Sequence, residues 1–342
     1  MDKYNILYLT ENMDNYSGAS YQKDVINSLS NKFEVNLYGP GYENYVDDEN
    51  LDVVLEKTKK DIKAIIFGHS FLSDSINTRT LQNFGNYSLS QINIPKIGIL
   101  NKEYVNLEKK LNFFKENKFD LCLTHHHLAH EYKDRTGVKF LFWPFATSSK
   151  FLCKESNKMV DVGFSGTLQN QFHKHSDLRS KVMKVFFHTL FNVPIRKKGE
   201  FKNINIVWNS KPNNLFSKVV NKFIRYYKHL NDEDYKRLLK ESKIFINTLS
   251  PADLISPRYF ECMASKTLIL CEKSKLYKKI FPDGTYIEFS DEKSLIDIIR
   301  HYLDDDMARN EITLNAQKFV EKNHFWEHRI ELLKHEIDSL IS

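Results

Sequence analysis

The strongest constraint on the fold is one stretch in which a strand, a polar loop, a short helix and a second strand follow one another. Residues 243–249, KIFINTL, are apolar and β-branched enough for a buried strand, which Ser250-Pro251 ends. Ser256-Pro257 is typical of a helix start, because serine suits the N-cap and proline the first turn. The helix is expected over residues 258–265 and the next strand, TLILC, over residues 267–271. This order predicts the repeating unit of a parallel α/β sheet.

Two carboxylates stand out in this stretch. Asp253 lies in the expected loop and Glu261 on the expected helix, with seven residues between them and with Arg258 one helical turn before Glu261. Carboxylates accept hydrogen bonds from sugar hydroxyls, while a guanidinium and the N–H groups of a helix N-terminus bind phosphate. The stretch therefore fits a phosphorylated, polyhydroxylated ligand, and it also fits an ordinary helix cap with a structural ion pair.

The order of an acid, seven residues, a glutamate and a helix of small residues resembles the Glu-x7-Glu motif of retaining GT-B glycosyltransferases. The string SPRYFECMAS at residues 256–265 is similar to the C-terminal domain of the group 1 glycosyltransferases, which include spore-maturation-protein-like enzymes. The resemblance implies that Glu261 holds the donor ribose and that Asp253 contacts the transferred sugar. The sequence departs from the family at Asp253, which is shorter than glutamate, and at Ser265-Lys266-Thr267, where the family usually has glycine.

The length of the chain agrees with the two-domain α/β architecture that the resemblance implies. At 342 residues the chain is long enough for two domains with separate cores. We expect an acceptor-side Rossmann-like domain over residues 1–148 and a Rossmann-like nucleotide-sugar donor domain over residues 149–323, with parallel sheets facing a cleft. HFWEHR at residues 324–329 is similar to the closing H-x-W/Y-x-x-R segment of the family. Residues 324–342 are therefore expected to form a helix that packs back on the N-terminal domain.

The first half of the chain alternates short apolar runs with helical segments, which predicts a parallel sheet covered by helices on both faces. The expected strands are residues 5–10, 33–38, 64–67, 96–100, 121–124 and 140–143. Ligands of such sheets bind at the carboxyl ends of the strands. The polar residues expected there are His69, Asn101, Glu103 and the triple histidine 125–127.

Two positions in the first half of the chain, His69 and Gly18, are candidates for the acceptor side. His69 follows a strand and a glycine, so it can serve either in acceptor chemistry or as an ordinary hydrogen-bonded loop histidine. Gly18 lies in a small-residue turn after the first strand, and in the resemblance this turn borders the acceptor side. A plain strand-to-helix turn explains Gly18 equally well.

The second domain is expected to begin with a strand over residues 160–164 that passes into Ser165-Gly166-Thr167. This resembles the first strand and glycine turn of the donor domain of the family. Lys174 and Arg179 follow at positions where they would neutralise a diphosphate, although a solvated basic face uses the same residues. The predicted donor-binding residues are Gly18, Gly166, Thr167, Lys174, Arg179, Ser256, Arg258, Tyr259 and Glu261, and the catalytic candidates are His69, Asp253 and Arg258.

The patterns that suggest a metal have simpler explanations. His126 and His130 are spaced by one helical turn, but no carboxylate completes an H-E-x-x-H motif. Asp304-Asp305-Asp306 lies between two expected helices, where an acidic N-terminal cap is expected. The four cysteines show no Cys-x-x-Cys spacing and are expected as buried thiols. Neither a metal nor another cofactor is expected, and the nucleotide diphosphate sugar is the donor substrate.

Charge and hydropathy limit the partners. Residues 174–228 hold thirteen Lys or Arg against two acids, although the net charge of the chain is only +6. Such a segment attracts phosphate on a nucleotide donor or on an anionic membrane surface, and no nucleic-acid-binding motif accompanies it. No apolar run reaches the roughly 18 residues that span a bilayer, and the N-terminus lacks a signal-peptide pattern. We expect a cytoplasmic protein that docks peripherally on the inner face of the plasma membrane through residues 186–227.

The sequence therefore predicts a glycosyltransferase that moves a sugar from a nucleotide diphosphate sugar to a glycan, lipid-linked or other acceptor. Retention of configuration and metal independence follow from the resemblance. Two alternatives stay open at this point. One is a nucleotide-sugar epimerase of the same fold, and the other is a non-catalytic sugar-nucleotide-binding partner protein, which the departures at Asp253 and Ser265-Lys266-Thr267 would fit.

Overall fold

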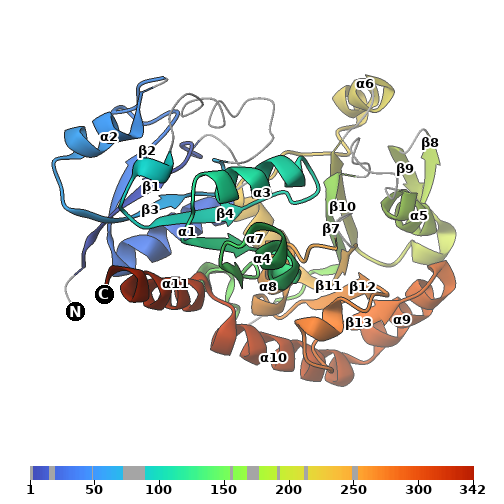
Figure 1. Ribbon diagram of the computed structural model, residues 1–342. Coiled ribbons are helices and arrows are strands. Elements are labelled where there is room, and N and C mark those ends of the chain that lie inside the picture. The colour runs from blue at the N-terminus through green and yellow to red at the C-terminus, as the bar shows by residue number, and fades with distance from the viewer. Residues whose placement is uncertain are drawn as a thin grey trace. The chain divides into compact units, whose positions relative to one another are not determined.

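The chain folds into two compact units, each built around a parallel β-sheet (Figure 1). Unit 1 comprises Met1–Ala146 and Trp326–Ser342, and unit 2 comprises Thr147–Phe325. The computed structural model describes residues 3–14, 20–47, 49–71, 89–154, 157–167, 177–190, 193–211, 215–248 and 253–342. The expected class of two parallel α/β units is confirmed.

The sheet of unit 1 has six parallel strands in the order β2-β1-β3-β4-β5-β6. The strands are β1 (Asn5–Leu9), β2 (Glu34–Tyr38), β3 (Ile62–Phe67), β4 (Lys96–Leu100), β5 (Leu121–Thr124) and β6 (Phe140–Phe142). The helices are α1 (Ser20–Lys32), α2 (Leu51–Thr58), α3 (Leu107–Glu116), α4 (Ala129–Thr136) and α11 (Trp326–Ile341). The apolar runs predicted as strands all form strands, with ends that move by up to two residues because propensity defines a boundary only loosely.

Close packing of α3 on this sheet depends on a glycine in β4. A Cβ atom on Gly98 would lie 2.3 Å from Cε1 of Phe114, a distance that atoms in contact do not reach. Phe114 is fully buried in the core of the unit. The absence of a side chain at Gly98 therefore sets how near α3 approaches the strands.

The closing helix α11 belongs to unit 1, as the fold prediction requires. Its apolar face buries Trp326, Ile330, Leu333 and Ile337. The indole Nε1 of Trp143 donates to the carbonyl of Arg329 over 3.1 Å, and Tyr4 Oη donates to Asp338 Oδ1 over 2.8 Å. These bonds join α11 to the residue before β1 and to the segment after β6.

The sheet of unit 2 has five parallel strands in the order β10-β7-β11-β12-β13. They are β7 (Val160–Thr167), β10 (Ile206–Lys211), β11 (Ser242–Asn247), β12 (Leu268–Glu272) and β13 (Ile287–Phe289), and an antiparallel hairpin of β8 (Phe187–Leu190) and β9 (Val193–Lys197) stands apart from them. The helices are α5 (Asp177–Phe186), α6 (Leu215–Ile224), α7 (Asp232–Glu241), α8 (Pro257–Ala264), α9 (Glu292–Asp304) and α10 (Asp306–Asn323). Short 3-10 turns cover Leu89–Gln91 in unit 1 and Ser149–Phe151, Gly199–Phe201 and Tyr277–Lys279 in unit 2.

Alternate residues of these strands face opposite layers of helices. Val162, Ile244 and Leu268 pack in one core with buried residues of α5 and α9. The intervening positions, such as Phe245 and Ile269, are also fully buried, because α7, α8 and α10 contact the sheet from β7 to β12. Strands buried on both faces explain why their sequences read as continuous apolar runs.

Several local predictions need correction. The β8–β9 hairpin and α6 were not predicted, because the basic charge of residues 186–227 obscures their short apolar patterns. His126 precedes α4, so it does not share a helix with His130, whose Nε2 lies 3.3 Å from Asp134 instead. The acidic cap is confirmed, since Asp305 accepts a hydrogen bond from the N–H of Ala308.

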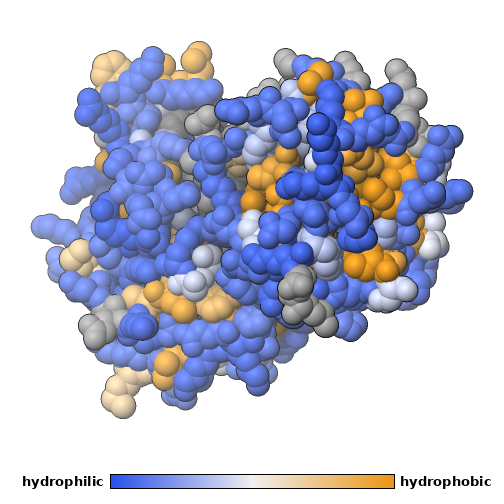
Figure 2. Space-filling view, turned by 90° about the vertical axis from the view of Figure 1, so that its left-hand side faces the viewer, coloured by the Kyte–Doolittle hydropathy of each residue, from blue (hydrophilic) through white to orange (hydrophobic). Residues whose placement is uncertain are grey.

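The surface is mostly hydrophilic, and the cysteine side chains are buried. Hydrophilic side chains cover most of the face seen in Figure 2, and hydrophobic ones gather at a few places. The cysteines at positions 122, 153, 262 and 271 are buried thiols, as predicted. Among the residues that the structure describes, no helix is both long enough and apolar enough to cross a bilayer.

Candidate functional site

Unit 2 gathers charged side chains at the carboxyl ends of β7 and β11 and at the start of α8. Gly166 is the next-to-last residue of β7, and Arg258 lies in the first turn of α8. Arg179 comes from α5, and its Nε donates to Oγ1 of Thr248, just after β11, over 2.7 Å. Three separate elements thus meet at the edge where ligands of parallel sheets bind.

Two guanidinium groups converge on the backbone of Gly166. A Cβ atom built at this position would lie 3.5 Å from Nη1 of Arg258 and 3.8 Å from Nη1 of Arg179. The φ angle of Gly166 is +153°, which side-chain-bearing residues rarely adopt. The glycine therefore lets the backbone approach two cations closely and leaves room for a ligand atom beside them.

The two guanidiniums act on each other. Burial, and then the neighbouring charge of Arg258, lowers the pKa of Arg179 to about 10. Like charges held close together in a partly buried place repel, and a bound anion relieves that repulsion. A diphosphate is an anion of suitable charge, and guanidinium groups bind its oxygens in a bidentate fashion.

Tyr235 on α7 connects Arg258 to Glu261. Its hydroxyl donates to Oε2 of Glu261 over 2.7 Å, and Nε of Arg258 lies 3.4 Å from the same hydroxyl oxygen. Glu261 is 6% exposed, and burial followed by the charge of Glu261 holds the pKa of Tyr235 well above its usual value. The tyrosine is therefore a neutral donor that fixes the carboxylate. No spacing rule connects residues on two different helices, so no sequence pattern points to Tyr235.

The other predicted residues of this stretch lie in different surroundings. Asp253 precedes α8, is exposed and has a φ angle of +53°, a left-handed conformation that aspartate tolerates. Ser256 occupies the N-cap position as predicted, with Pro257 in the first turn, but its side chain makes no capping hydrogen bond to α8. Tyr259 is 2% exposed, and its hydroxyl lies 3.0 Å from that of Tyr277. Tyr259 thus supports α8 from within the core.

Three predicted donor residues cannot be placed by their side chains. Gly18 and Lys174 lie outside the described residues, and Thr167 is described as the last residue of β7 by its backbone only. Among the residues that are described, no three His, Cys, Asp or Glu side chains are grouped as metal ligands.

In unit 1 the strand order brings His69, which follows β3, to His125, which follows β5. The two Nε2 atoms are 3.0 Å apart, and His125 Nδ1 lies 2.8 Å from the carbonyl oxygen of Trp143. Because that carbonyl can only accept, His125 carries its proton on Nδ1, and His69 donates from Nε2. The remaining Nδ1 of His69 is buried and has no hydrogen-bond partner among the described residues.

This histidine pair is held neutral. Burial, opposed by the bond to Trp143, lowers the pKa of His125 to about 3, and burial followed by His125 lowers the pKa of His69 well below its usual value. His69 is 0% exposed, so the residue predicted for acceptor chemistry has its ring inside unit 1. A direct role for His69 in catalysis would require the ring to become exposed.

Asn101 and Glu103 lie with the histidine pair at the carboxyl ends of the strands, as predicted. Asn101 Nδ2 donates to the carbonyl of His69 over 3.0 Å, and Thr124 Oγ1 donates to Glu103 Oε1 over 2.9 Å. Burial raises the pKa of Glu103. At this sheet edge, His69, Asn101, Glu103 and His125 therefore bond to neighbouring side chains and to main-chain carbonyls.

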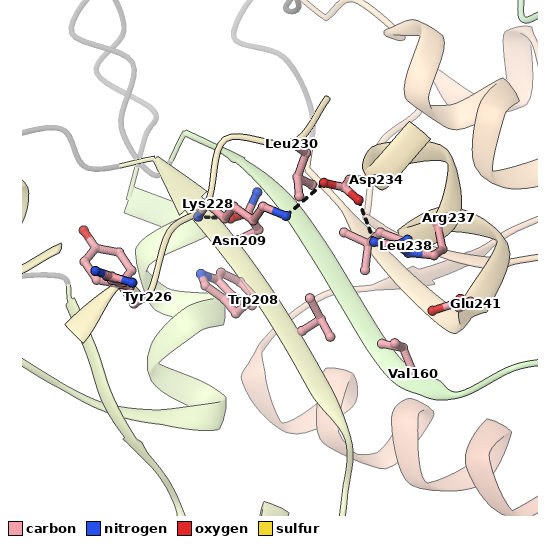
Figure 3. A pocket seen from close by; sticks show the side chains of 12 residues that line it. Val160, Trp208, Asn209, Tyr226, Lys228, Leu230, Asp234, Arg237, Leu238 and Glu241 are labelled. Atoms are coloured by element: carbon pink, nitrogen blue, oxygen red, sulfur yellow. Dashed lines mark hydrogen bonds and ion pairs between the residues drawn. The ribbon is translucent and has the colours of Figure 1, made fainter. Parts of the chain in front are cut away.

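A cavity of about 360 Å³ lies in unit 2 beside β10 and α7 (Figure 3). Trp208 and Asn209 line it from β10, and the segment 225–230 and α7 complete its wall. Lys228 Nζ lies 3.0 Å from Asp234 Oδ2, and the main-chain N–H of Lys228 donates to Asn209 Oδ1 over 3.1 Å. Asp234 faces this cavity, while the next residue, Tyr235, bonds to Glu261.

Known proteins resemble the chain in part of its sequence and in its fold. Residues 185–335 match the model of a family described as glycosyl transferase-like. No curated protein matches the sequence significantly. A glycosyltransferase from Rickettsia africae ESF-5 has a TM-score of 0.63 at 11% identity, with 100% of both chains covered. Anabaena HepE in complex with UDP and glucose has a TM-score of 0.64 at 12% identity, with 98% of this chain and 99% of that chain covered.

A third similar structure is named for a different activity. A putative UDP-N-acetylglucosamine 2-epimerase from Listeria monocytogenes has a TM-score of 0.57 at 9% identity, with 97% of this chain and 95% of that chain covered. At such identities the similarity shows the fold alone.

Proposed function

We propose that this chain, which has the GT-B fold of glycosyltransferases, transfers a sugar from a nucleotide diphosphate sugar to an acceptor. The observation that carries the proposal is the convergence of Arg179 and Arg258 on Gly166. This is a place where backbone, helix N-terminus and two cations can all meet a diphosphate. That HepE was solved with UDP and glucose makes a UDP-sugar the first donor to test.

The transferase chemistry that we propose centres on departure of the diphosphate. Negative charge grows on the leaving phosphate as the sugar becomes oxocarbenium-like, and groups fixed in advance stabilise that charge best. Arg258 and Arg179 would meet it directly. Each such contact typically contributes about 3–4 kcal/mol to transition-state stabilisation. Because these cations belong to the chain itself, we propose transfer without a metal. Retention of configuration is proposed from the resemblance to retaining GT-B glycosyltransferases.

Glu261 and Asp253 would orient the rest of the donor. Tyr235 fixes the position of the Glu261 carboxylate, which is the proposed acceptor for a ribose hydroxyl. Asp253 is exposed before α8 and is the proposed contact for the transferred sugar. The cavity beside Asn209 and Asp234 is large enough for a nucleobase. The acceptor is proposed to be a glycan or a lipid-linked sugar.

A thermal-shift screen with UDP-, GDP-, ADP- and CMP-sugars tests the donor site. A ligand that binds only the folded protein raises its melting temperature, by an amount that grows with ligand concentration. We expect one base class to stabilise the wild type, and we expect that shift to disappear in Arg258→Gln and Arg179→Gln. Arg300→Gln is the control, because Arg300 is exposed on α9 and pairs with Glu200. A shift retained in both site variants would contradict the proposal.

The similarity to a putative 2-epimerase favours one rival activity on the same fold. An epimerase would change the configuration of the donor in the absence of any acceptor. Incubation of the stabilising nucleotide sugar alone, followed by chromatography of the sugar, separates the two functions. Unchanged donor that is consumed only when an acceptor is added supports the transferase. Tight binding without turnover would instead indicate a sugar-nucleotide-binding partner protein.

A further inference from the structure

Helix α6 presents an apolar stripe to solvent. Leu215, Val219 and Phe223 are spaced by four residues and therefore lie on one side of the helix. They are 79%, 44% and 81% exposed. Helices of folded domains normally turn such a stripe toward the core. Figure 1 shows α6 beyond the end of β10, away from the layers of helices that cover the sheet of unit 2.

The opposite side of α6 holds the helix on unit 2. Ser217 is 1% exposed. The side chain of Asn221 bonds the following segment twice, since its Nδ2 donates to the carbonyl of Tyr227 over 3.3 Å and its Oδ1 accepts from the N–H of Tyr227 over 2.8 Å. The side of α6 that carries Ser217 and Asn221 is therefore held against unit 2, and the apolar stripe faces solvent.

The charge around the stripe is of one sign. Lys218 and Lys222 are exposed beside it on the same helix. The sequence contains no Asp or Glu from position 201 to position 231. The cations in this interval are Lys202, Lys211, Lys218, Lys222, Arg225 and Lys228. Lys228 pairs with Asp234, so Lys218 and Lys222 are the cations on α6 that flank the stripe. A surface that is both apolar and cationic is complementary to a partner with apolar depth and negative charge.

We propose that α6 docks on the surface of an anionic membrane. In this arrangement Leu215, Val219 and Phe223 insert among the upper acyl chains, while Lys218 and Lys222 contact lipid phosphates. The hairpin β8–β9 adds exposed apolar side chains at Leu190 and Ile195, and its Ile195 and Arg196 line a hollow together with Tyr226, which follows α6. The sequence predicted docking through residues 186–227, and this proposal assigns the inserted side chains to α6 within that segment. The proposal does not depend on the donor site.

Co-sedimentation of the full-length protein with phosphatidylcholine vesicles, with and without phosphatidylglycerol, tests the docking. We expect binding only when the anionic lipid is present, and we expect it to weaken as salt is raised. The double variant Leu215→Ser/Phe223→Ser should bind about tenfold or more weakly, because two inserted apolar side chains are lost. Lys218→Gln/Lys222→Gln should lose about fivefold per lysine and become less sensitive to salt.

Matched controls separate docking from a general loss of surface groups. Met307 on α10 is 84% exposed, so Met307→Ser removes an equally exposed apolar side chain elsewhere in unit 2. Lys293→Gln/Lys318→Gln removes two exposed lysines from α9 and α10. Both controls should sediment like the wild type. All variants should keep the wild-type melting temperature, since none of the substituted side chains is buried.

Three results would overturn the proposal. The first is no binding of the wild type to anionic vesicles, and the second is binding that does not depend on the anionic lipid. The third is binding that survives the loss of both Leu215 and Phe223. Sedimentation velocity without lipid measures the oligomeric state and tests the alternative that the stripe joins two copies of this chain. A dimer that Phe223→Ser dissolves would assign the stripe to self-association instead.

Discussion

Both units place polar side chains at the carboxyl ends of their parallel strands, but the two clusters handle charge in opposite ways. In unit 1 His69 and His125 are buried and neutral, and they bond to each other and to a backbone carbonyl. In unit 2 Arg179 and Arg258 keep their charges, and both lie beside the bare backbone of Gly166. The same position in two similar sheets thus carries a neutral cluster in one and a cationic cluster in the other.

The difference indicates what each cluster is suited for. Aromatic rings surround the histidines, with ring centroids of His125 and Phe145 3.6 Å apart and those of His69 and Tyr21 5.3 Å apart. Such surroundings favour uncharged groups and stabilise unit 1. Two close guanidiniums are more stable with an anion than without one. We therefore expect substitutions in unit 2 to change ligand binding and turnover, and substitutions in unit 1 to change stability.

The largest effect should follow from Arg258→Gln, which removes charge from the cationic cluster. We expect the rate of sugar transfer to fall about 100- to 1000-fold, as when a preorganised donor to a developing anion is lost. Arg258→Lys should recover only part of the rate, because an ammonium lacks the planar fork of the guanidinium. The measurement is the initial rate with the donor that stabilises the wild type.

Arg300→Gln on α9 is the control for this rate, since it removes an exposed arginine from the same unit. Its rate should match the wild type. A fall of less than about tenfold in Arg258→Gln would show that the guanidinium is not a main contact of the leaving group.

A smaller effect is expected from Gly166→Ala, which fills the space between the two guanidiniums. The new methyl group would lie 3.5 Å from Arg258 Nη1, and the φ angle of +153° would be strained for alanine. We expect donor affinity to fall about tenfold and the free energy of unfolding to fall by about 1–3 kcal/mol. Isothermal titration with the donor and urea unfolding measure the two quantities. Gly199→Ala is the matched control, because a Cβ atom there meets no atom within 4 Å.

The neutral cluster of unit 1 predicts a pH effect on stability. The pKa of His125 is about 3 in the folded protein, against about 6.5 for an unperturbed histidine. As pH falls from 6.5 toward 3, the unfolded chain takes up a proton that the folded chain does not, so stability decreases with falling pH. The loss is about 1.4 kcal/mol per pH unit for one such histidine, and it is absent above pH 6.5.

His125→Asn should reduce this pH dependence, because one of the buried histidines is gone. We expect the difference in unfolding free energy between pH 6 and pH 5 to shrink by about 1 kcal/mol, measured by urea unfolding. His301→Asn, at an exposed position on α9, controls for the removal of a histidine. An unchanged slope in His125→Asn would mean that His125 is already charged in the folded protein.

Local signals allowed much of unit 2 to be predicted from the sequence. Ser256-Pro257 predicted the start of α8. The apolar run from residue 160 predicted a strand that ends near Gly166. The alternation of strands and helices also predicted that His69 and His125 would both lie at the carboxyl ends of the strands. The burial of that pair was not predictable, because it depends on Trp143 and Trp326, two rings from distant parts of the chain. The bond from Tyr235 to Glu261 was equally hidden, since it depends on how two helices pack.

The smallest effect should come from Ser256→Ala, and it distinguishes a structural cap from a ligand contact. Asp305 caps α10 through its side chain, and its replacement by alanine should cost about 1 kcal/mol of stability. Ser256 occupies the same position at α8 without a capping bond, so its replacement should cost less than about 0.5 kcal/mol. If the hydroxyl serves the donor, affinity should still fall a few-fold in titrations. Equal loss of stability in both variants would instead show that Ser256 caps α8. Arg258 and Gly166 would then remain as the proposed donor contacts near the start of α8, without Ser256.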